Sequence, residues 1–179
     1  MFTEIGSLRR LWSFSLFASA FFFLTTAHAA AQDAPKVDLS VGYQFTHLNG
    51  SNGVGGTNIP AGWTASVTGR INPFVNVVGE VNGAYKDGVK LHRYLGGLRF
   101  GGGPSTGTNY IVVFGQALAG VSKSAATTGF TIQPGLGLDI HGSGKVGGRI
   151  NVDYLLDRHD GITDKGLRVA AGVVINLGR

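Results

Sequence analysis

One short motif in this sequence has the residue types of a catalytic site. His141-Gly142-Ser143 places a base next to a hydroxyl, and a serine activated by a histidine is the nucleophile of many hydrolases. Glycines lie within and after the triplet, and a polar, glycine-rich stretch between apolar segments is typical of a turn. We therefore expect a turn here, with no catalytic role.

Scattered histidines form a second candidate site. His47, His92 and His159 could bind a metal ion, with a carboxylate from Asp157 or Asp160. Their spacing matches no ligand motif, so we expect solvated loop histidines and no metal or cofactor. The chain also has no cysteine, which excludes thiolate ligands, disulfides and a cysteine nucleophile.

Nucleotide and nucleic-acid binding are not indicated. The glycine-rich stretch Gly53-Val54-Gly55-Gly56 does not follow a strand that ends in a phosphate-binding turn. Beyond residue 31 the chain carries 13 basic and 9 acidic residues, a mild excess, and it has no stripe of lysines interleaved with aromatic residues. We expect no nucleic-acid partner.

The N-terminus predicts export. Arg9 and Arg10 precede an apolar run of about fourteen residues, Leu11 to Leu24, which is too short for a spanning helix of roughly twenty residues. Small residues follow, so we expect a signal peptide over 1–31, cleaved after Ala29 or Ala31, and a mature domain over 32–179. No cysteine follows the run, which argues against a lipoprotein.

The mature chain alternates between apolar and polar residues in eight segments. This period of two predicts strands, because successive side chains of a strand point to opposite faces. In the segment 110–121, Gln116 shares a face with Val112, Phe114 and Leu118, so this segment is the least regular. The eight segments are about 37–48, 61–71, 74–86, 91–101, 110–121, 129–140, 146–156 and 167–177.

An even number of strands of about ten residues, separated by turn residues, is typical of a transmembrane barrel. The connections then fall alternately at two ends. We expect Asn72-Pro73, 101–109 and 141–145 to face the periplasm. We expect the outer loops to be short and to comprise 49–60, 87–90, 122–128 and 157–165.

Charge placement separates a membrane barrel from a soluble ligand-binding barrel, whose outer wall is polar. Each lysine after the signal peptide lies at or beyond a strand end: Lys36, Lys86, Lys90, Lys123, Lys145 and Lys165. Seven mid-strand charges instead lie on the face opposite the large apolar residues: Arg70, Glu80, Arg99, Asp139, Arg149, Asp153 and Arg168. A mid-membrane arginine facing lipid costs about 2–4 kcal/mol, so these seven are expected to face an enclosed lumen.

The seven charges predict a structural network inside the barrel. Four are positive and three negative, and a buried charge requires a partner. Arg149 and Asp153 share one face of their strand, and Asp139 and Arg168 on the adjacent strands are expected cross-strand partners. We expect the network to form a neutralised plug that blocks an aqueous channel.

Three stretches resemble one family. They are 94–100 (YLGGLRF), 149–155 (RINVDYL) and 172–177 (GVVINL). In these stretches the chain resembles the small outer-membrane β-barrel family of the OmpA, OmpX and opacity-protein type. The resemblance implies an all-β fold, an eight-stranded antiparallel up-and-down transmembrane β-barrel, in the outer membrane of a Gram-negative-type cell.

The resemblance also implies partners. The last stretch is similar to the signal read by the barrel assembly machinery, although Leu177 stands where the family usually has an aromatic residue. The expected partners are outer-membrane lipid and lipopolysaccharide, with the assembly machinery and periplasmic chaperones during biogenesis. We expect a monomer, and we expect no peptidoglycan-binding domain after the last strand.

Three functions remain open at this point. The first is a non-enzymatic protein that serves envelope structure or surface interaction. The second is a narrow channel for small solutes. The third is a lipid A-modifying enzyme, whose deacylase type uses a His-x-Ser pair near the outer rim, whereas His141-Gly142-Ser143 is expected at the periplasmic end.

Overall fold

The computed structural model describes residues 37–49, 56–101, 109–124, 127–159 and 161–177. The expected signal peptide and both cleavage positions lie outside these ranges. None of the described ranges forms a helix with the length and apolarity needed to cross a membrane. The strands are β1 (Val37–Asn49), β2 (Thr57–Ile59), β3 (Ala61–Arg70), β4 (Val75–Lys86), β5 (Val89–Gly101), β6 (Tyr110–Lys123), β7 (Thr128–His141), β8 (Val146–His159) and β9 (Ile162–Leu177).

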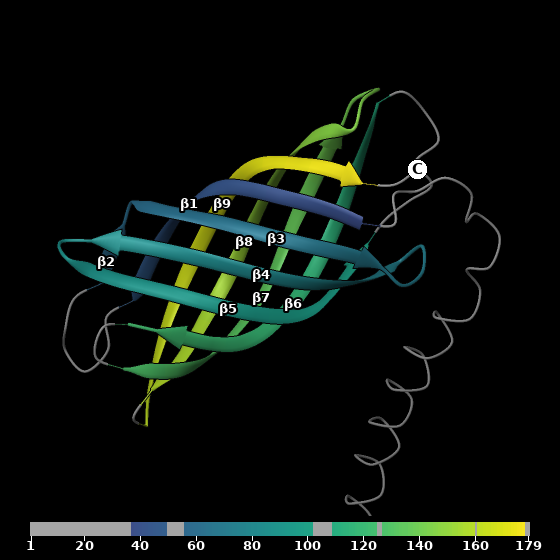
Figure 1. Ribbon diagram of the computed structural model, residues 1–179. Helices are drawn as coiled ribbons and strands as arrows, with labels where there is room; N and C mark the ends of the chain where they lie inside the picture. The colour runs from purple at the N-terminus through teal and green to yellow at the C-terminus, as the bar shows by residue number, and fades with distance from the viewer. Residues whose placement is uncertain (1–36, 50–55, 102–108, 125–126, 160, 178–179) are drawn as a thin grey trace, which may run out of the picture. The chain divides into compact units, whose positions relative to one another are not determined.

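The strands form one antiparallel sheet that closes on itself. Each strand from β3 to β9 pairs with the next along the chain, and β9 pairs with β1 from Val37↔Leu177 to Asn49↔Lys165. Figure 1 shows the first strand lying beside the last one. Closure leaves no strand edge along this seam unpaired, as a barrel requires.

β2 and β3 together occupy one place in the wall, so the barrel has eight strands. β1 pairs with β3 up to Tyr43↔Trp63 and with β2 from Thr46↔Ile59 onward. Between these pairs lie two residues of β1 but three of its partner, which is the count of a β-bulge. The bulge contains Pro60, which has no N–H to give to the ladder.

The predicted fold class is confirmed, and all eight predicted segments are strands. The outer ends of several strands are longer than predicted, and the expected loop 157–165 is wrong. β8 continues to His159 and β9 begins at Ile162. The charged residues there resemble a loop in sequence, but in the structure they continue the β8–β9 hairpin beyond the predicted strand ends.

The connection between β4 and β5 is shorter than the expected 87–90. It consists of Asp87 and Gly88, with φ angles of 48° and 82°. Positive φ at both central residues is the geometry of a type I′ turn, which suits a tight hairpin. We call the end of the barrel that carries this turn and the β8–β9 turn the outer end.

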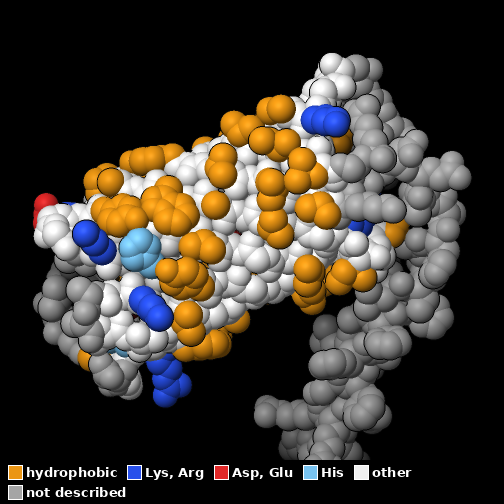
Figure 2. Space-filling view, viewed as in Figure 1, with side chains coloured by type: hydrophobic (Ala, Val, Ile, Leu, Met, Phe, Trp, Pro, Cys, Tyr) orange, Lys and Arg blue, Asp and Glu red, His pale blue; other side chains and the backbone are white. Residues whose placement is uncertain are grey.

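The wall has its apolar face outside. Val113 and Leu136 are 70% and 69% exposed, and large apolar residues of every long strand are exposed with them. Figure 2 shows hydrophobic side chains across the visible wall, with Lys and Arg near its two ends. This is the reverse of a soluble barrel and matches the polarity of a membrane barrel.

The predicted segment with the least regular alternation, 110–121, forms most of β6. Phe114, Gln116 and Leu118 are buried in the lumen, while Ile111 and Val113 face outward. The lumen therefore holds some apolar side chains as well as polar ones. Leu118 contacts Val78 and Leu95 in a small buried cluster.

Candidate functional site

The centre of the lumen is organised by Arg168 on β9, which is fully buried. Its Nε and Nη2 donate to Asp153 Oδ2 at 2.9 and 2.7 Å. Its Nη1 and Nη2 donate to the two oxygens of Glu80 at 2.6 and 3.2 Å, and Nη1 also donates to Gln44 Oε1 at 3.0 Å. A guanidinium has five N–H donors, so every one is used.

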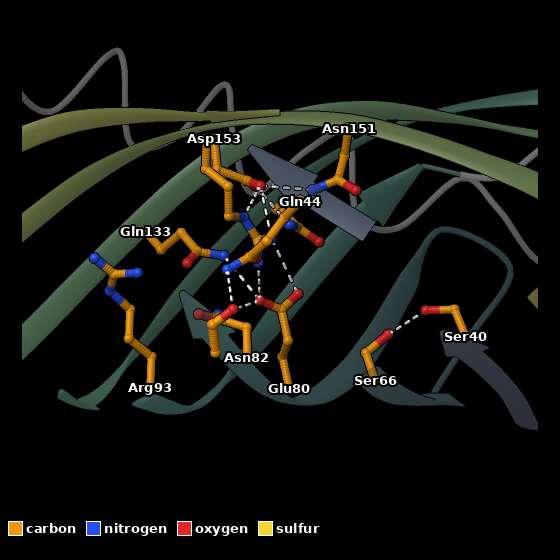
Figure 3. A network of polar contacts seen from close by, with 12 residues as sticks. Ser40, Gln44, Ser66, Glu80, Asn82, Arg93, Gln133, Asn151 and Asp153 are labelled. Carbon is orange, nitrogen blue, oxygen red and sulfur yellow. Dashed lines mark hydrogen bonds and ion pairs between the residues drawn. The ribbon is translucent and has the colours of Figure 1, made fainter. Parts of the chain in front are cut away.

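Neighbouring amides complete the coordination of the two carboxylates. Glu80 Oε1 accepts from Asn82 Nδ2 at 2.9 Å and from Gln133 Nε2 at 3.2 Å. Figure 3 shows these three side chains converging, with Asp153 on the opposite side of the cluster. Asn151 Nδ2 donates to Asp153 Oδ2 at 2.5 Å. We call these residues with Arg168 and Gln44 the central cluster.

A second ion-pair cluster lies toward the other end of the barrel. Arg149 on β8 binds Asp139 on β7 with two bonds, Nε–Oδ1 at 2.6 Å and Nη2–Oδ2 at 2.7 Å. Its remaining bonds cross the lumen to β1, with Nη1 to Ser40 Oγ and Nη2 to Asp38 Oδ1, both at 3.2 Å. Ser40 Oγ in turn lies 2.7 Å from Ser66 Oγ on β3. These residues form the inner cluster.

Gln116 and Arg99 extend the central cluster toward Phe114. Gln116 Nε2 donates to Asp153 Oδ1 at 2.7 Å, and Gln116 Oε1 accepts from Arg99 at 3.0 and 3.3 Å. Arg99 also donates to Thr68 Oγ1 at 3.2 Å. Its guanidinium carbon lies 4.3 Å from the ring centroid of Phe114, and that of Arg149 lies 5.5 Å away. The aromatic ring thus lies against both guanidinium groups.

A third cluster, the outer cluster, was missed by the sequence analysis. Arg93 on β5 is fully buried and binds Asp157 on β8 through Nε–Oδ1 at 3.3 Å and Nη2–Oδ2 at 2.6 Å. Thr131 on β7 also donates to Asp157. Arg93 lies on the same face of its strand as Arg99, so the alternation could have revealed it. Asp157 was assigned to a loop because β8 was predicted to end too early.

Six of the seven predicted lumen charges are buried: Glu80, Arg99, Asp139, Arg149, Asp153 and Arg168. The pairs are Arg149 with Asp139 and Arg168 with both Asp153 and Glu80. Arg70 differs from the other six. It is the last residue of β3, is only partly buried, and has no ion pair with another described residue.

Little space remains between the clusters. A cavity of about 10 Å³ lies against Ser66, Glu80, Arg99 and Arg149, where the central and inner clusters meet. This volume is close to the minimum for one water molecule. A larger cavity, about 190 Å³, lies at the outer end beside Asp157, His159 and Asp164. The side chains of the central and inner clusters therefore leave room for about one water molecule at this point of the lumen.

The possible catalytic motif is held in a structural contact. His141 is the last residue of β7, its ring stacks on Tyr110 with centroids 4.6 Å apart, and its Nδ1 lies 3.2 Å from Asn176 Nδ2. Ser143 is exposed in the turn that follows. This turn lies at the same end as residues 71–74, opposite the outer end.

The other histidines do not converge. His47 Nδ1 lies 2.6 Å from Asn58 Oδ1, His92 packs edge-on to Tyr85, and His159 lies 3.6 Å from Asp164. Within the described ranges no group of three or more His, Cys, Asp or Glu side chains could hold a metal ion. Asp160 lies outside those ranges, as does most of Gly53–Gly56.

Solved structures of two bacterial proteins share this fold. The crystal structure of Neisserial surface protein A (NspA) aligns with a TM-score of 0.64 at 11% identity, over 82% of this chain and all of NspA. That of Ail, the attachment invasion locus protein of Yersinia pestis, aligns with a TM-score of 0.54 at 16% identity, over 80% of this chain and all of Ail. No protein-family model and no curated protein matches the sequence. The chain therefore shares its barrel fold with NspA and Ail.

Proposed function

We propose that this protein is a non-enzymatic integral protein of the outer membrane of a Gram-negative-type cell, where it serves envelope structure or surface interaction. The carrying observation is the reversed polarity of the barrel. Large apolar side chains such as Val113 and Leu136 are exposed, while Arg93, Arg168 and Asp153 are fully buried. Such a wall is stable in lipid and would aggregate in water.

The filled lumen supports a structural role over a channel. Each ion pair crosses between strands, and Arg168 joins β9 to β8 and β4. Buried charges are costly to separate, because removing one partner leaves the other uncompensated. The clusters act as a neutralised plug, and solute passage would require breaking several of these contacts at once.

The comparison proteins support a location at the cell surface. One is named a surface protein and the other an attachment invasion locus protein. At the outer end, the described turn between β4 and β5 is short and consists of Asp87-Gly88. Surface interaction would therefore use the rim of the barrel and its hairpins.

The apolar wall defines the proposed partners. Outer-membrane lipid and lipopolysaccharide would surround it, and the barrel assembly machinery and periplasmic chaperones would handle the unfolded chain. Lys90 and Lys123 are exposed near the outer end, where cations favour anionic headgroups. We propose a monomer, because the strand edges are paired within one chain.

The geometry around His141 supports a non-enzymatic role. A general base needs a free nitrogen within reach of its nucleophile. Here the ring is stacked on Tyr110, its Nδ1 faces Asn176, and Ser143 lies exposed in the turn beyond the strand. This arrangement favours the structural assignment of the triplet over the lipid A deacylase alternative.

Fractionation of cells that express the full chain tests membrane location. We expect the protein in the outer-membrane fraction, with faster gel mobility before heating than after it, as a folded barrel shows. Recovery in the soluble fraction, with no heat-dependent shift, would overturn the proposal.

Two further measurements separate the alternative functions. Planar-bilayer recording of the purified protein is expected to show no discrete conductance steps, and steady steps would instead establish the channel. Mass spectrometry of lipid A from expressing cells is expected to show no mass change. A loss of an acyl chain that depends on Ser143 would establish the enzyme.

A further inference from the structure

The outer face of the wall carries its cations at one end of the barrel. Alternation along the strands places four exposed cations on this face near the outer end: Lys90 on β5, Lys123 on β6, Arg158 on β8 and Lys165 on β9. Among the described strand residues, no lysine or arginine faces outward in the half of the wall nearer the other end. The two ends of the wall therefore present different charge to their surroundings.

None of these four cations forms an ion pair with a carboxylate of the described ranges. The described carboxylates that belong to strands lie instead on the lumen face: Asp38, Glu80, Asp139, Asp153, Asp157 and Asp164. A surface that carries charge of one sign attracts ligands of the opposite sign. The outer end of the wall is thus suited to an anion that comes from outside the barrel.

Two of the cations lie close together on β5 and β6. Lys123 is the register partner of His92, and Lys90 lies two residues before His92 on the same face of β5. Side chains directly opposite each other on neighbouring strands have Cβ atoms about 4.5–5.5 Å apart. The two ammonium groups and the imidazole can therefore reach the same small anion.

Aromatic side chains border this group. Tyr85 is the register partner of Lys90, and its ring packs edge-on to His92 with centroids 5.6 Å apart. Trp63 Nε1 donates to the Tyr85 hydroxyl at 2.9 Å, and the Trp63 ring lies 6.5 Å from that of His92. We call Trp63, Tyr85, Lys90, His92 and Lys123 the headgroup patch. Figure 2 shows Lys, Arg and His side chains beside hydrophobic ones at the left end of the wall.

The depth of the headgroup patch is set by its neighbours. Tyr94 and Val121 are register partners one step nearer the middle of the wall, and they are 47% and 41% exposed. Such apolar side chains belong in hydrocarbon, and tryptophan and tyrosine gather where hydrocarbon meets the headgroups. The patch therefore lies at the level of the headgroups.

We propose that the headgroup patch binds the phosphate group of an anionic lipid in the outer leaflet. A phosphate monoester carries a charge of about −1.5 to −2 at pH 7, which the two lysines match. The acyl chains of the same lipid lie against Tyr94 and Val121. A free anion would gain the polar contacts alone, so charge and apolar surface together select a lipid. The proposal rests on the outer-membrane location proposed above and names the chemical group that this part of the wall recognises.

Fluorescence of Trp63 tests the site, because it is the only tryptophan after residue 31. The mature protein is reconstituted into phosphatidylcholine vesicles that contain phosphatidic acid, whose headgroup is a phosphate monoester. Brominated acyl chains, placed on one lipid at a time, quench a nearby tryptophan and report which lipid lies beside it. We expect phosphatidic acid to bind beside Trp63 about tenfold or more tightly than phosphatidylcholine, since each lysine contributes to binding of an anionic lipid.

Two double variants separate a local site from the general charge of the outer end. Lys90→Gln with Lys123→Gln should bring the preference for phosphatidic acid close to one. Arg158→Gln with Lys165→Gln removes the same charge from β8 and β9 and should keep the preference. Heat-dependent gel mobility checks that both variants fold. An equal loss in the two variants would overturn the headgroup patch as a site.

The remaining outcomes separate the site from the membrane location. Equal quenching of the wild type by both brominated lipids would refute the headgroup patch and leave the membrane location intact. No quenching by either lipid would contradict the membrane location itself, and the patch with it. Inorganic phosphate, compared with chloride at the same ionic strength, should not change the preference. If it abolished the preference, the patch would bind free phosphate and the lipid assignment would be wrong.

Discussion

Arg168 and Glu80 are 88 residues apart in the chain, and their side chains meet inside the lumen with Nη1 2.6 Å from Oε1. The same guanidinium binds Asp153 at 2.7 Å, so one cation compensates two buried carboxylates. The contact joins three strands, β4, β8 and β9, across the interior of the barrel. This arrangement makes Arg168 the residue whose loss would leave the most buried charge uncompensated.

The substitution Arg168→Met tests this role. It leaves Glu80 and Asp153 buried without their cation, and removing one partner of a buried ion pair costs about 3–5 kcal/mol of unfolding free energy. We expect a strongly lowered urea midpoint in lipid vesicles. Arg158→Met, on the exposed face of β8, should change the unfolding free energy by about 0.5 kcal/mol or less. Equal effects of the two substitutions would show that the central cluster contributes little.

The substitution Leu136→Arg tests whether lipid covers the wall. Leu136 is 69% exposed in the middle of β7, and an arginine facing the bilayer centre costs about 2–4 kcal/mol. Ile162→Arg, at the first residue of β9, should cost about 1 kcal/mol or less because the rim meets headgroups and water. The urea midpoints of both variants in vesicles provide the measurement. A wall in contact with water would tolerate both substitutions alike.

The seam between the first and last strands depends on Gly172. A Cβ atom there would lie 2.2 Å from the backbone oxygen of Val41 and 2.6 Å from Cα of Gly42, its register partner. We expect Gly172→Ala to force the strands apart and to cost about 1–3 kcal/mol of unfolding free energy. The folded fraction, measured by heat-dependent gel mobility, should fall.

Gly148→Ala is the matched control for the seam. A Cβ at Gly148 would have no heavy atom within 4 Å, so this variant should fold as the wild type does. If Gly172→Ala folded equally well, the close approach of β1 and β9 would not limit closure.

The β4–β5 turn requires glycine at its second position. Gly88 has a φ of 82°, and an L-residue with a side chain loses about 1–2 kcal/mol in that conformation. We expect Gly88→Ala to lower the urea midpoint accordingly. Gly79→Ala, on β4 where a Cβ would meet nothing within 4 Å, should leave the midpoint unchanged or slightly higher. The opposite order of the two variants would contradict the turn geometry.

Much of the fold could be predicted because apolar and polar side chains alternate along each strand. In β7, Phe130 and Ile132 face outward while Thr131 and Gln133 face inward, as the period of two requires. The same alternation placed Glu80, Asp153 and Arg168 on inward faces. Strand ends were predicted less well. Near the outer hairpin ends both faces carry polar residues, so the alternation between apolar and polar residues is lost there.

The candidate site could be predicted only in part. Alternation assigns a face to a residue, and it says nothing of which residue lies across the lumen. Arg93 and Asp157 were missed because each lay near a predicted strand end, although their true strands continue past them. On β6 the lumen face includes Phe114 and Leu118, which their apolar character alone would assign to the outward face.

By itself the sequence determined the number of strands, their faces and the placement of charges away from the outer wall. Only the tertiary structure decided that Arg168 binds both Glu80 and Asp153, that Arg149 binds Asp139 and that Arg99 reaches Gln116. The reason is geometric. The face of a residue depends on its own strand, whereas its partner depends on the register of all eight strands around the barrel and on the reach of long side chains across the lumen.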